Sequence, residues 1–327
     1  MTTNKGLWAA LLAGAALVGA TVPAIAQDGA DIFVIGGKSD DPFWSIVKRG
    51  AEDAGQVVTA QGGTVTWLGP QNYDNLGADA ADLIRTAISQ NPDAIVAPNW
   101  VPEAMDEAFK AAVEAGVPVI VYNAGGMAAS DRLGAMNYIG SDDTEAGRAG
   151  GAYFAEHGAT NVVCVNTIPG AASLEARCAG IAEGMAANGG ASTQLPLPAS
   201  SFGNPTAVAQ AIKAALLEDT TIDGLITISA GDADSAAIAV SQAGVGETVA
   251  LGTFDMNKGT LDRIAAGDQL FAIDQQPYLQ GYLAVSLLNG YVNYGLDVPT
   301  APILTGPGIV DSTNIAATLA GVAAGAR

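Results

Sequence analysis

Two acidic side chains, a lysine and two adjacent aromatic rings stand close together near the start of the chain, at Lys38, Asp40, Asp41, Phe43 and Trp44. Carboxylates accept hydrogen bonds from hydroxyl groups, and aromatic faces pack against the C–H faces of a sugar or polyol. The combination predicts a site for a polyhydroxylated small molecule. The alternative is structural, because the Asp-Pro pair could cap a helix while both rings face the core.

Further candidates lie after apolar runs or near the start of helical segments. They are Asn99, Asn123, Arg177, Phe202, Asp232, Asp255 and Gln275. Arg177 offers a forked donor for ligand oxygens, although it could instead pair with a surface acid. Asn123 in VYNAGG and Asp255 in GTFDMNKG each end a strand-like run, where a simple turn residue is the competing interpretation. Asp232 could equally cap the helix that follows it. We expect these residues to line one cleft together with the first group.

Sequence patterns of enzymes are largely absent. The single histidine, His157, ends a helical segment, where a basic residue meets the helix dipole favourably. No GxSxG, phosphate-loop or HExxH motif occurs. Asp40 and Asp41 could act as an acid–base pair, but acids adjacent in sequence rarely converge on one bond. We therefore expect no catalytic residues, no cofactor and no metal site.

The elements that must position these side chains alternate between strands and helices. Predicted strands cover 31–35, 64–68, 94–97, 117–121, 137–139, 161–165, 192–195, 223–228, 248–251 and 270–273, and predicted helices cover 44–60, 76–90, 103–115, 143–157, 174–188, 204–218, 232–243 and 258–266. Such alternation indicates an α/β fold with parallel sheets flanked by helices.

The two halves of the chain repeat the same order. VPVIVYNAGG (117–126) and VALGTFDMNKG (249–259) occupy equivalent places, each a buried strand that ends in a polar side chain. About 300 residues exceed one compact core, so we expect two lobes. Open α/β sheets bind ligands at the carboxyl ends of their strands, which predicts a cleft lined from both lobes.

Residues 1–26 combine a lysine, an apolar run and Ala24-Ile25-Ala26, the pattern of a cleavable signal peptide. We expect export to the periplasm, and no later segment is long and apolar enough to span a bilayer. The only cysteines, Cys164 and Cys178, are disulfide candidates in that oxidising compartment. The net charge of −20 argues against nucleic-acid binding.

Six segments in order make the chain resemble periplasmic sugar-binding proteins of the ribose-binding type: DDPFW, VPVIVYN, YIGSDDTEAGRAGG, the region around Arg177, LGTFD and IDQQPYLQGYLA. The resemblance covers nearly the whole mature chain. It implies two Rossmann-like lobes joined by a three-crossing hinge, which close around a ligand. The expected division is 1–26 as signal peptide, 27–140 plus 277–296 as N-terminal lobe, and 141–276 plus 297–327 as C-terminal lobe.

The resemblance also implies roles for individual residues. Phe43 and Trp44 match aromatic residues that sandwich a sugar, and Phe202 matches the aromatic residue of the opposite lobe. Asp41, Arg177, Asp255 and Gln275 match polar contacts. Many members of the family carry Asp-Arg at Asn123-Ala124 and Asn-Asp at Gly231-Asp232, which argues against ribose itself. Lys38 hints at a different pattern of ligand hydroxyls.

We therefore expect a monomeric substrate-binding component of an ABC importer, with a monosaccharide or polyol as ligand and a membrane permease as partner. One alternative is a secreted sugar-processing enzyme on the same fold. Another is a ligand receptor for chemotaxis or a sensor protein. A LacI-like repressor shares the architecture, but the signal peptide, the acidic charge and the lack of a basic helix-turn-helix argue against it.

Overall fold

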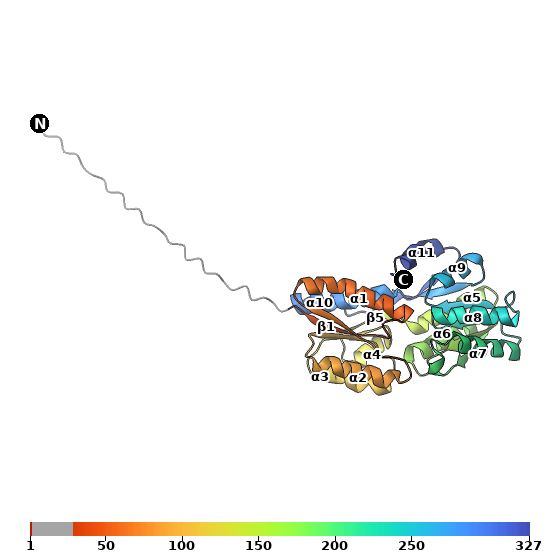
Figure 1. Cartoon of the computed structure of the whole chain (residues 1–327), viewed down its shortest axis with the longest axis horizontal. Coiled ribbons are helices and arrows are strands. Elements are labelled where there is room, and N and C mark those ends of the chain that lie inside the picture. The colour runs from red at the N-terminus through yellow and green to blue at the C-terminus, as the bar shows by residue number, and fades with distance from the viewer. Residues whose placement is uncertain (2–28) are drawn as a thin grey trace.

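In a computed structural model, the chain forms two α/β lobes side by side (Figure 1), and the structure describes Met1 and residues 29–327. The expected signal peptide at 1–26 lies outside the described residues. Each lobe is built on a six-stranded sheet with helices on both faces, which confirms the predicted fold class.

The first sheet has the strand order β11-β5-β4-β3-β1-β2, and all its neighbours are parallel. Its strands are β1 (Asp31–Ile35), β2 (Thr64–Leu68), β3 (Ala94–Ala97), β4 (Val119–Tyr122), β5 (Asn137–Ser141) and β11 (Ile303–Gly306). Its helices are α1 (Pro42–Ala60), α2 (Leu76–Ser89), α3 (Pro102–Glu114), α4 (Gly126–Leu133) and α10 (Pro277–Tyr294). Helices α1 and α10 pack together on one face, and α2, α3 and α4 cover the other (Figure 1).

The second sheet has the equivalent order β12-β10-β9-β8-β6-β7, and only β12 is antiparallel to its neighbour. Its strands are β6 (Asn161–Asn166), β7 (Ala191–Pro196), β8 (Gly224–Thr227), β9 (Ala250–Phe254), β10 (Phe271–Asp274) and β12 (Gly308–Val310). Its helices are α5 (Asp143–Glu156), α6 (Ala172–Ala187), the short 3-10 turn η1 (Ala199–Ser201), α7 (Pro205–Glu218), α8 (Ala230–Ala243), α9 (Lys258–Ala266) and α11 (Ile315–Ala323). Strands β4 and β9 therefore occupy equivalent places, as predicted from VPVIVYNAGG and VALGTFDMNKG.

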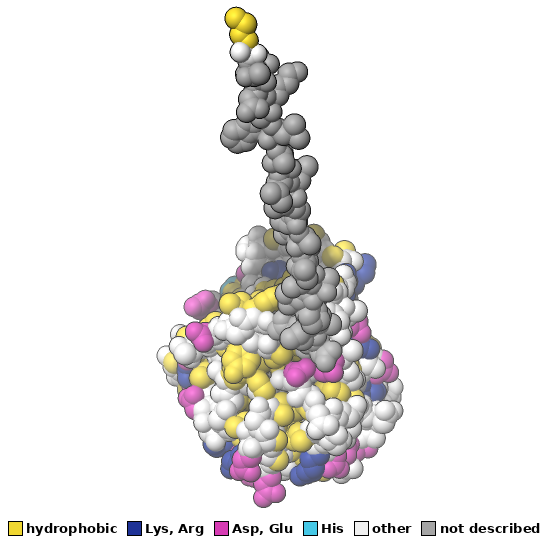
Figure 2. Space-filling model, turned by 90° about the vertical axis from the view of Figure 1, so that its left-hand side faces the viewer, with side chains coloured by type: hydrophobic (Ala, Val, Ile, Leu, Met, Phe, Trp, Pro, Cys, Tyr) yellow, Lys and Arg dark blue, Asp and Glu magenta, His cyan; other side chains and the backbone are white. Residues whose placement is uncertain are grey.

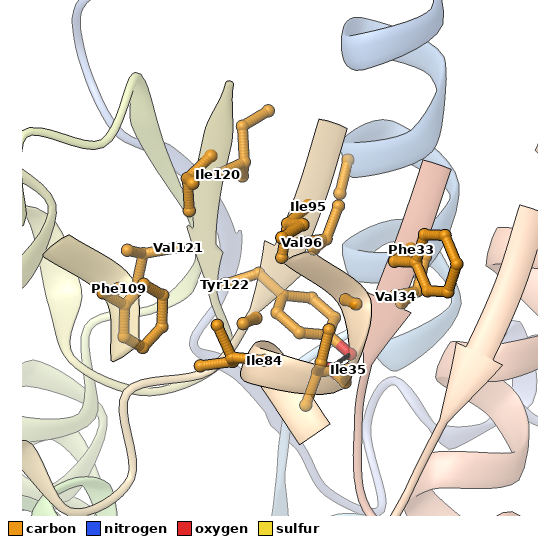
Figure 3. Close-up of a cluster of buried hydrophobic side chains, with 14 of the residues drawn as sticks. Phe33, Val34, Ile35, Ile84, Ile95, Val96, Phe109, Ile120, Val121 and Tyr122 are labelled. Atoms are coloured by element: carbon orange, nitrogen blue, oxygen red, sulfur yellow. Dashed lines mark hydrogen bonds between the residues drawn. The ribbon is translucent and has the colours of Figure 1, made fainter. Parts of the chain in front are cut away.

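The core of the first lobe lies between its sheet and the flanking helices (Figure 3). Strand residues such as Val34 and Ile95 are fully buried, as are Ile84 of α2 and Phe109 of α3. The hydroxyl of the buried Tyr122 donates to the carbonyl of Ile35 at 2.8 Å. Both faces of the central strands are covered, which explains their continuous apolar sequences.

The chain passes between the lobes at three points, at residues 141–143, 274–277 and 306–308. The third crossing differs from expectation. Residues 297–327 were expected in the C-terminal lobe, but β11 pairs with β5 in the first sheet before the chain crosses to β12. The short run ILTG is a strand because it pairs with β5 at the edge of the first sheet, which local sequence does not reveal.

Among the described residues, no helix is both long and apolar enough to cross a membrane. Figure 2 shows the molecule from the end of the first lobe, where acidic, basic and hydrophobic side chains are intermingled on the surface.

Candidate functional site

The carboxyl ends of strands from both sheets converge on a cavity of about 80 Å³ between the lobes, which we call the main cavity. The structure brings most of the predicted site residues to its walls, namely Asp41, Phe43, Trp44, Asn123, Arg177, Phe202, Asp255 and Gln275. The strand-end rule for open α/β sheets thus selected residues that line one cavity.

The first wall is built on the amino-terminal end of α1. Asp41 caps this helix, because its Oδ1 accepts from the amides of Phe43 and Trp44 at 2.9 and 3.2 Å. Its Oδ2 accepts from the hydroxyl of Tyr73 at 3.1 Å. The structural interpretation of Asp41 as a helix cap is therefore correct, and the capping carboxylate also faces the main cavity. Burial raises the pKa of Asp41 above its usual value.

The aromatic rings of this wall support one another. Trp44 is 7% exposed and makes edge-to-face contacts with Phe43 at 5.2 Å and with Trp100 at 5.3 Å between ring centroids. Phe43 is only half-buried. The two adjacent rings thus differ in role, since Trp44 anchors the cluster in the core and Phe43 offers free surface to the cavity.

The opposite wall is organised around Arg177, which is 4% exposed. Its Nε donates to Asp143 at 2.8 Å, its Nη2 to Oε1 of Gln275 at 2.7 Å, and its Nη1 to the carbonyl of Ile228 at 3.2 Å. Gln275 in turn donates through Nε2 to Oδ1 of Asp255 at 2.6 Å. The guanidinium therefore fixes a chain of polar groups across the floor of the cavity.

Two local features hold Arg177 in place. Helices α5 and α6 touch so closely that a β-carbon on Gly147 would overlap the carbonyl oxygen of Arg177. The neighbouring Cys178 forms the expected disulfide with Cys164, which ties α6 to strand β6. The disulfide is confirmed, and its place beside Arg177 gives it a structural part in the site.

Asn123 and Asp255 are equivalent residues of the two lobes. They follow β4 and β9, and their backbones have positive φ angles of 60° and 64°. Each amide donates across its sheet, to the carbonyls of Ile139 and Ile273 respectively, both at 2.9 Å. Left-handed backbone is unusual outside glycine and recurs at functional sites. It turns both side chains toward the space between the lobes.

Carboxylates in this region resist ionisation. Burial raises the pKa of Asp255 to about 7, although the charge of Arg177 and a hydrogen bond from Gln275 lower it. Burial likewise raises the pKa of Asp143 to about 6, against the same guanidinium. Asp232 also has a pKa raised to about 6 by burial, while hydroxyl groups of Thr167 and Ser229 donate to it, each at 2.9 Å. These acids lack the water that normally stabilises their charge.

Asp232 lies beside the main cavity rather than in it. It lines an adjoining hollow of about 180 Å³, which we call the side compartment. The two spaces share Asp41, Phe43, Phe202, Ser229 and Asp255 as walls.

Three predicted residues lie elsewhere. Lys38 and Asp40 form an ion pair of 3.5 Å at an outer hollow near the mouth of the cleft, where the Asp40 side chain is 80% exposed. Asn99 is fully buried, but its amide donates to Asp106 and its carbonyl oxygen accepts from Arg132. The structure therefore does not bring Asn99 to the main cavity, because its side chain serves the packing of α3 and α4.

The sequence analysis did not select Tyr73, Asp143 or Ser229. Tyr73 and Ser229 line the main cavity, and Asp143 orients Arg177. All three follow the carboxyl end of a strand, after β2, β5 and β8. Applying the strand-end rule to every strand would have found them.

The lobes touch around the main cavity. The ring of Tyr73 meets that of Phe202 edge-on at 5.1 Å, and the amide of Ala172 donates to the carbonyl of Trp100 at 2.8 Å. The arrangement is thus a closed one, in which a ligand would be enclosed from both sides. Within the part of the chain that the structure describes, no cluster of three or more metal-binding side chains occurs.

Comparison with known proteins places these observations in a family. Residues 32–296 match the family described as "Periplasmic binding protein domain". A xylose/arabinose-binding protein of Sulfolobus acidocaldarius is 24% identical over 302 residues, which cover 84% of this chain and 69% of that protein.

Solved structures with the same fold are also found. A carbohydrate transporter from Acidothermus cellulolyticus in complex with myo-inositol is 33% identical, with a TM-score of 0.83 over 91% of this chain and 100% of the other. A glucose-galactose binding protein from Geobacillus stearothermophilus is 19% identical, with a TM-score of 0.76 over 88% of this chain and 99% of the other, a likeness in fold.

Proposed function

The chain belongs to the periplasmic binding protein domain family, and we propose that it binds a monosaccharide or cyclic polyol as the substrate-binding component of an ABC importer. The proposal rests chiefly on one observation. The main cavity combines the free faces of Phe43 and Phe202 with the polar groups of Asp41, Arg177 and Asp255.

This combination suits an uncharged ring that carries many hydroxyl groups. Ring faces cover the C–H surface of such a ligand, while carboxylates accept and the guanidinium donates hydrogen bonds. Hydroxyls left unpaired on burial would cost about 1–3 kcal/mol each, so the density of polar groups favours a polyhydroxylated ligand over an apolar one. The similar carbohydrate transporter from Acidothermus cellulolyticus holds myo-inositol, which supports a ring of this size and polarity.

Capture and delivery follow from two lobes joined by three crossings. The ligand enters between the open lobes, and closure brings Tyr73 against Phe202 and Trp100 against Ala172. We infer export through cleavage after residue 26, function as a monomer in the periplasm, and docking of the closed form on a membrane permease. The signal-like sequence and the family support these steps.

The test is calorimetry with the mature protein against D-ribose, D-xylose, D-arabinose, D-galactose, D-allose and myo-inositol. We expect at least one ligand to bind with micromolar or tighter affinity and Asp255→Asn to weaken it at least tenfold. Lys38→Ala is the matched control at the outer hollow and should change affinity less than threefold, because exposed ion pairs contribute little. Absence of binding throughout the panel would contradict the proposal.

A sugar-processing enzyme is the second candidate, and the raised pKa of Asp255 favours it, because a general acid needs a pKa near neutrality. We attribute the raised pKa of Asp255 to its burial in a cavity where ligand hydroxyls would supply the missing hydrogen bonds. NMR of the bound ligand after prolonged incubation separates the two functions. An unchanged ligand supports the binding protein, whereas turnover that Asp255→Asn abolishes would establish the enzyme.

A further inference from the structure

The side compartment offers more space than a single ring in the main cavity requires. It has a volume of about 180 Å³, against about 80 Å³ for the main cavity, and the two spaces share five lining residues. Its own lining comes from several elements, with Ile46 of α1, Pro205 of α7, Ser235 of α8, Met256 after β9, and Arg327. The shared walls place this space next to a ring bound in the main cavity.

The walls of the side compartment are chiefly apolar. Ile46, Pro205, Met256 and Pro277 present hydrocarbon or thioether surface from both lobes. Covering such surface with an apolar group is favourable by roughly 25 cal/mol per Å². A second sugar ring would meet too few polar partners here, so the walls favour a hydrocarbon substituent.

The charges around the compartment exclude an anionic substituent. Asp41, Asp232, Asp255 and Asp274 all line it, whereas Arg327 is the one basic side chain among its described lining residues. The Nε of Arg327 already lies 3.3 Å from Oδ2 of Asp274. A carboxylate or phosphate would therefore face several acids and a guanidinium that is already paired.

One polar group in the compartment lacks a partner. Ser235 is 1% exposed, and its Oγ has no hydrogen bond from any described residue. A buried hydroxyl without a partner is unfavourable, so a ligand oxygen within its reach would gain a hydrogen bond that the protein itself does not supply. This serine supplies a specific polar contact inside an otherwise apolar space.

We propose that the side compartment is a subsite for an uncharged, mainly apolar substituent on the ligand ring, such as an alkyl or aryl ether whose oxygen accepts from Ser235. The inference rests on the proposed function, because the ring itself occupies the main cavity. The preferred ligand is then a substituted sugar or cyclitol rather than the plain ring.

Calorimetry can test this with matched ligands. The probes are D-ribose, D-galactose and myo-inositol, with the methyl, propyl and phenyl glycosides of the two sugars and the mono-O-methyl and mono-O-propyl ethers of the inositol. We expect at least one substituted ligand to bind tenfold or more tightly than its parent ring, since each buried methylene contributes favourably.

Variants test whether the tighter binding of the substituted ligand arises in the side compartment. Ser235→Leu fills the compartment and should abolish the advantage of the substituted ligand while changing affinity for the parent ring less than threefold. Ile46→Trp fills it from the first lobe and serves if the serine variant does not fold. Ser89→Leu, on the exposed end of α2, is the matched control and should change neither affinity.

The two proposals fail in different ways. If a parent ring binds and every substituted form binds more weakly, the subsite is refuted and the binding function stands. Equal loss of parent and substituted ligand in Ser235→Leu would also refute it. If neither plain nor substituted rings bind, the proposed function fails, and the subsite fails with it.

Discussion

Replacing Arg177 with methionine should destabilise the ligand-free protein by about 3–5 kcal/mol at pH 8, the cost of removing one partner of a buried ion pair. Methionine preserves much of the packing against Phe254, whose ring centroid lies 4.5 Å from the guanidinium carbon. It removes the donors to Asp143, Gln275 and the carbonyl of Ile228. Asp143 is 8% exposed, so water cannot replace the lost partner.

This cost should be smaller in acid. The pKa of Asp143 is raised by burial to about 6 even though Arg177 lowers it, and without Arg177 it rises further. A carboxyl group whose pKa is higher in the folded than in the unfolded protein binds its proton more tightly when folded. Stability therefore rises as the pH falls through the folded-state pKa. Between pH 8 and pH 5 the variant therefore gains more stability than the wild type, because Asp143 in the variant takes up its proton at a higher pH.

Urea unfolding followed by circular dichroism at pH 8 and pH 5 measures both effects. Arg177→Met combined with Asp143→Asn should recover part of the loss at pH 8, since no buried charge then remains unpaired. Arg148→Met is the control, because Arg148 pairs with Glu183 on the exposed surface of the same helix pair and its loss should cost little. A cost of Arg177→Met below about 1 kcal/mol, or one equal at the two pH values, would refute the reasoning.

Three further predictions concern the disulfide, the aromatic wall and closure. Replacing both Cys164 and Cys178 with alanine should lower the free energy of unfolding by about 3 kcal/mol, as expected for a short closed loop. Thermal unfolding with and without reductant measures this effect, and an unchanged melting temperature would contradict it. Phe43→Ala should weaken ligand binding about tenfold with little loss of stability, whereas Trp44→Ala should cost about 3–5 kcal/mol of folding free energy because the ring is buried. Calorimetry and thermal unfolding compare the two variants, and equal losses of stability would contradict the different roles of the two rings. Burial raises the pKa of Asp255 to about 7, and separation of the lobes should expose this carboxyl group to water and lower its pKa. The closed ligand-free form should then bind the proton more tightly than the open form, so small-angle scattering should find a smaller radius of gyration at pH 5 than at pH 8. The opposite order would show that closure does not bury Asp255.

The sequence predicted most strands of the two sheets and most of the helices between them. Strands 31–35 and 94–97 agree with β1 and β3, since buried parallel strands read as apolar runs between turns. The predicted strand 64–68 agrees with the edge strand β2, which is only partly buried. It did not predict α4, α10, β11, β12 or α11. Strands β11 and β12 have four and three residues, and their conformation depends on the edge strands that they meet. The third crossing between the lobes was misplaced for the same reason.

Some residues of the candidate site could also be predicted from the sequence, whereas others could not. Asp41 was predicted both as a helix cap and as a cavity residue, and it is both, because the cap lies at the carboxyl end of β1. Asn99 met the same local criteria, yet its side chain turns to Asp106 and Arg132. Tyr73 was not selected from the sequence, yet its hydroxyl donates to Asp41 and its ring meets Phe202 of the opposite lobe.

By itself the sequence determined the alternation of strands and helices, the repeat of one lobe by the other and the strand ends at which polar residues gather. Hydrophobic periodicity and helix caps are local properties, so one chain segment is enough to reveal them. Only the tertiary structure decided which of those polar residues share a cavity, which acids have a raised pKa, and that a side compartment adjoins the main cavity. Side-chain direction, desolvation and enclosed space all depend on how two lobes close on each other, and no single segment of the chain contains that information.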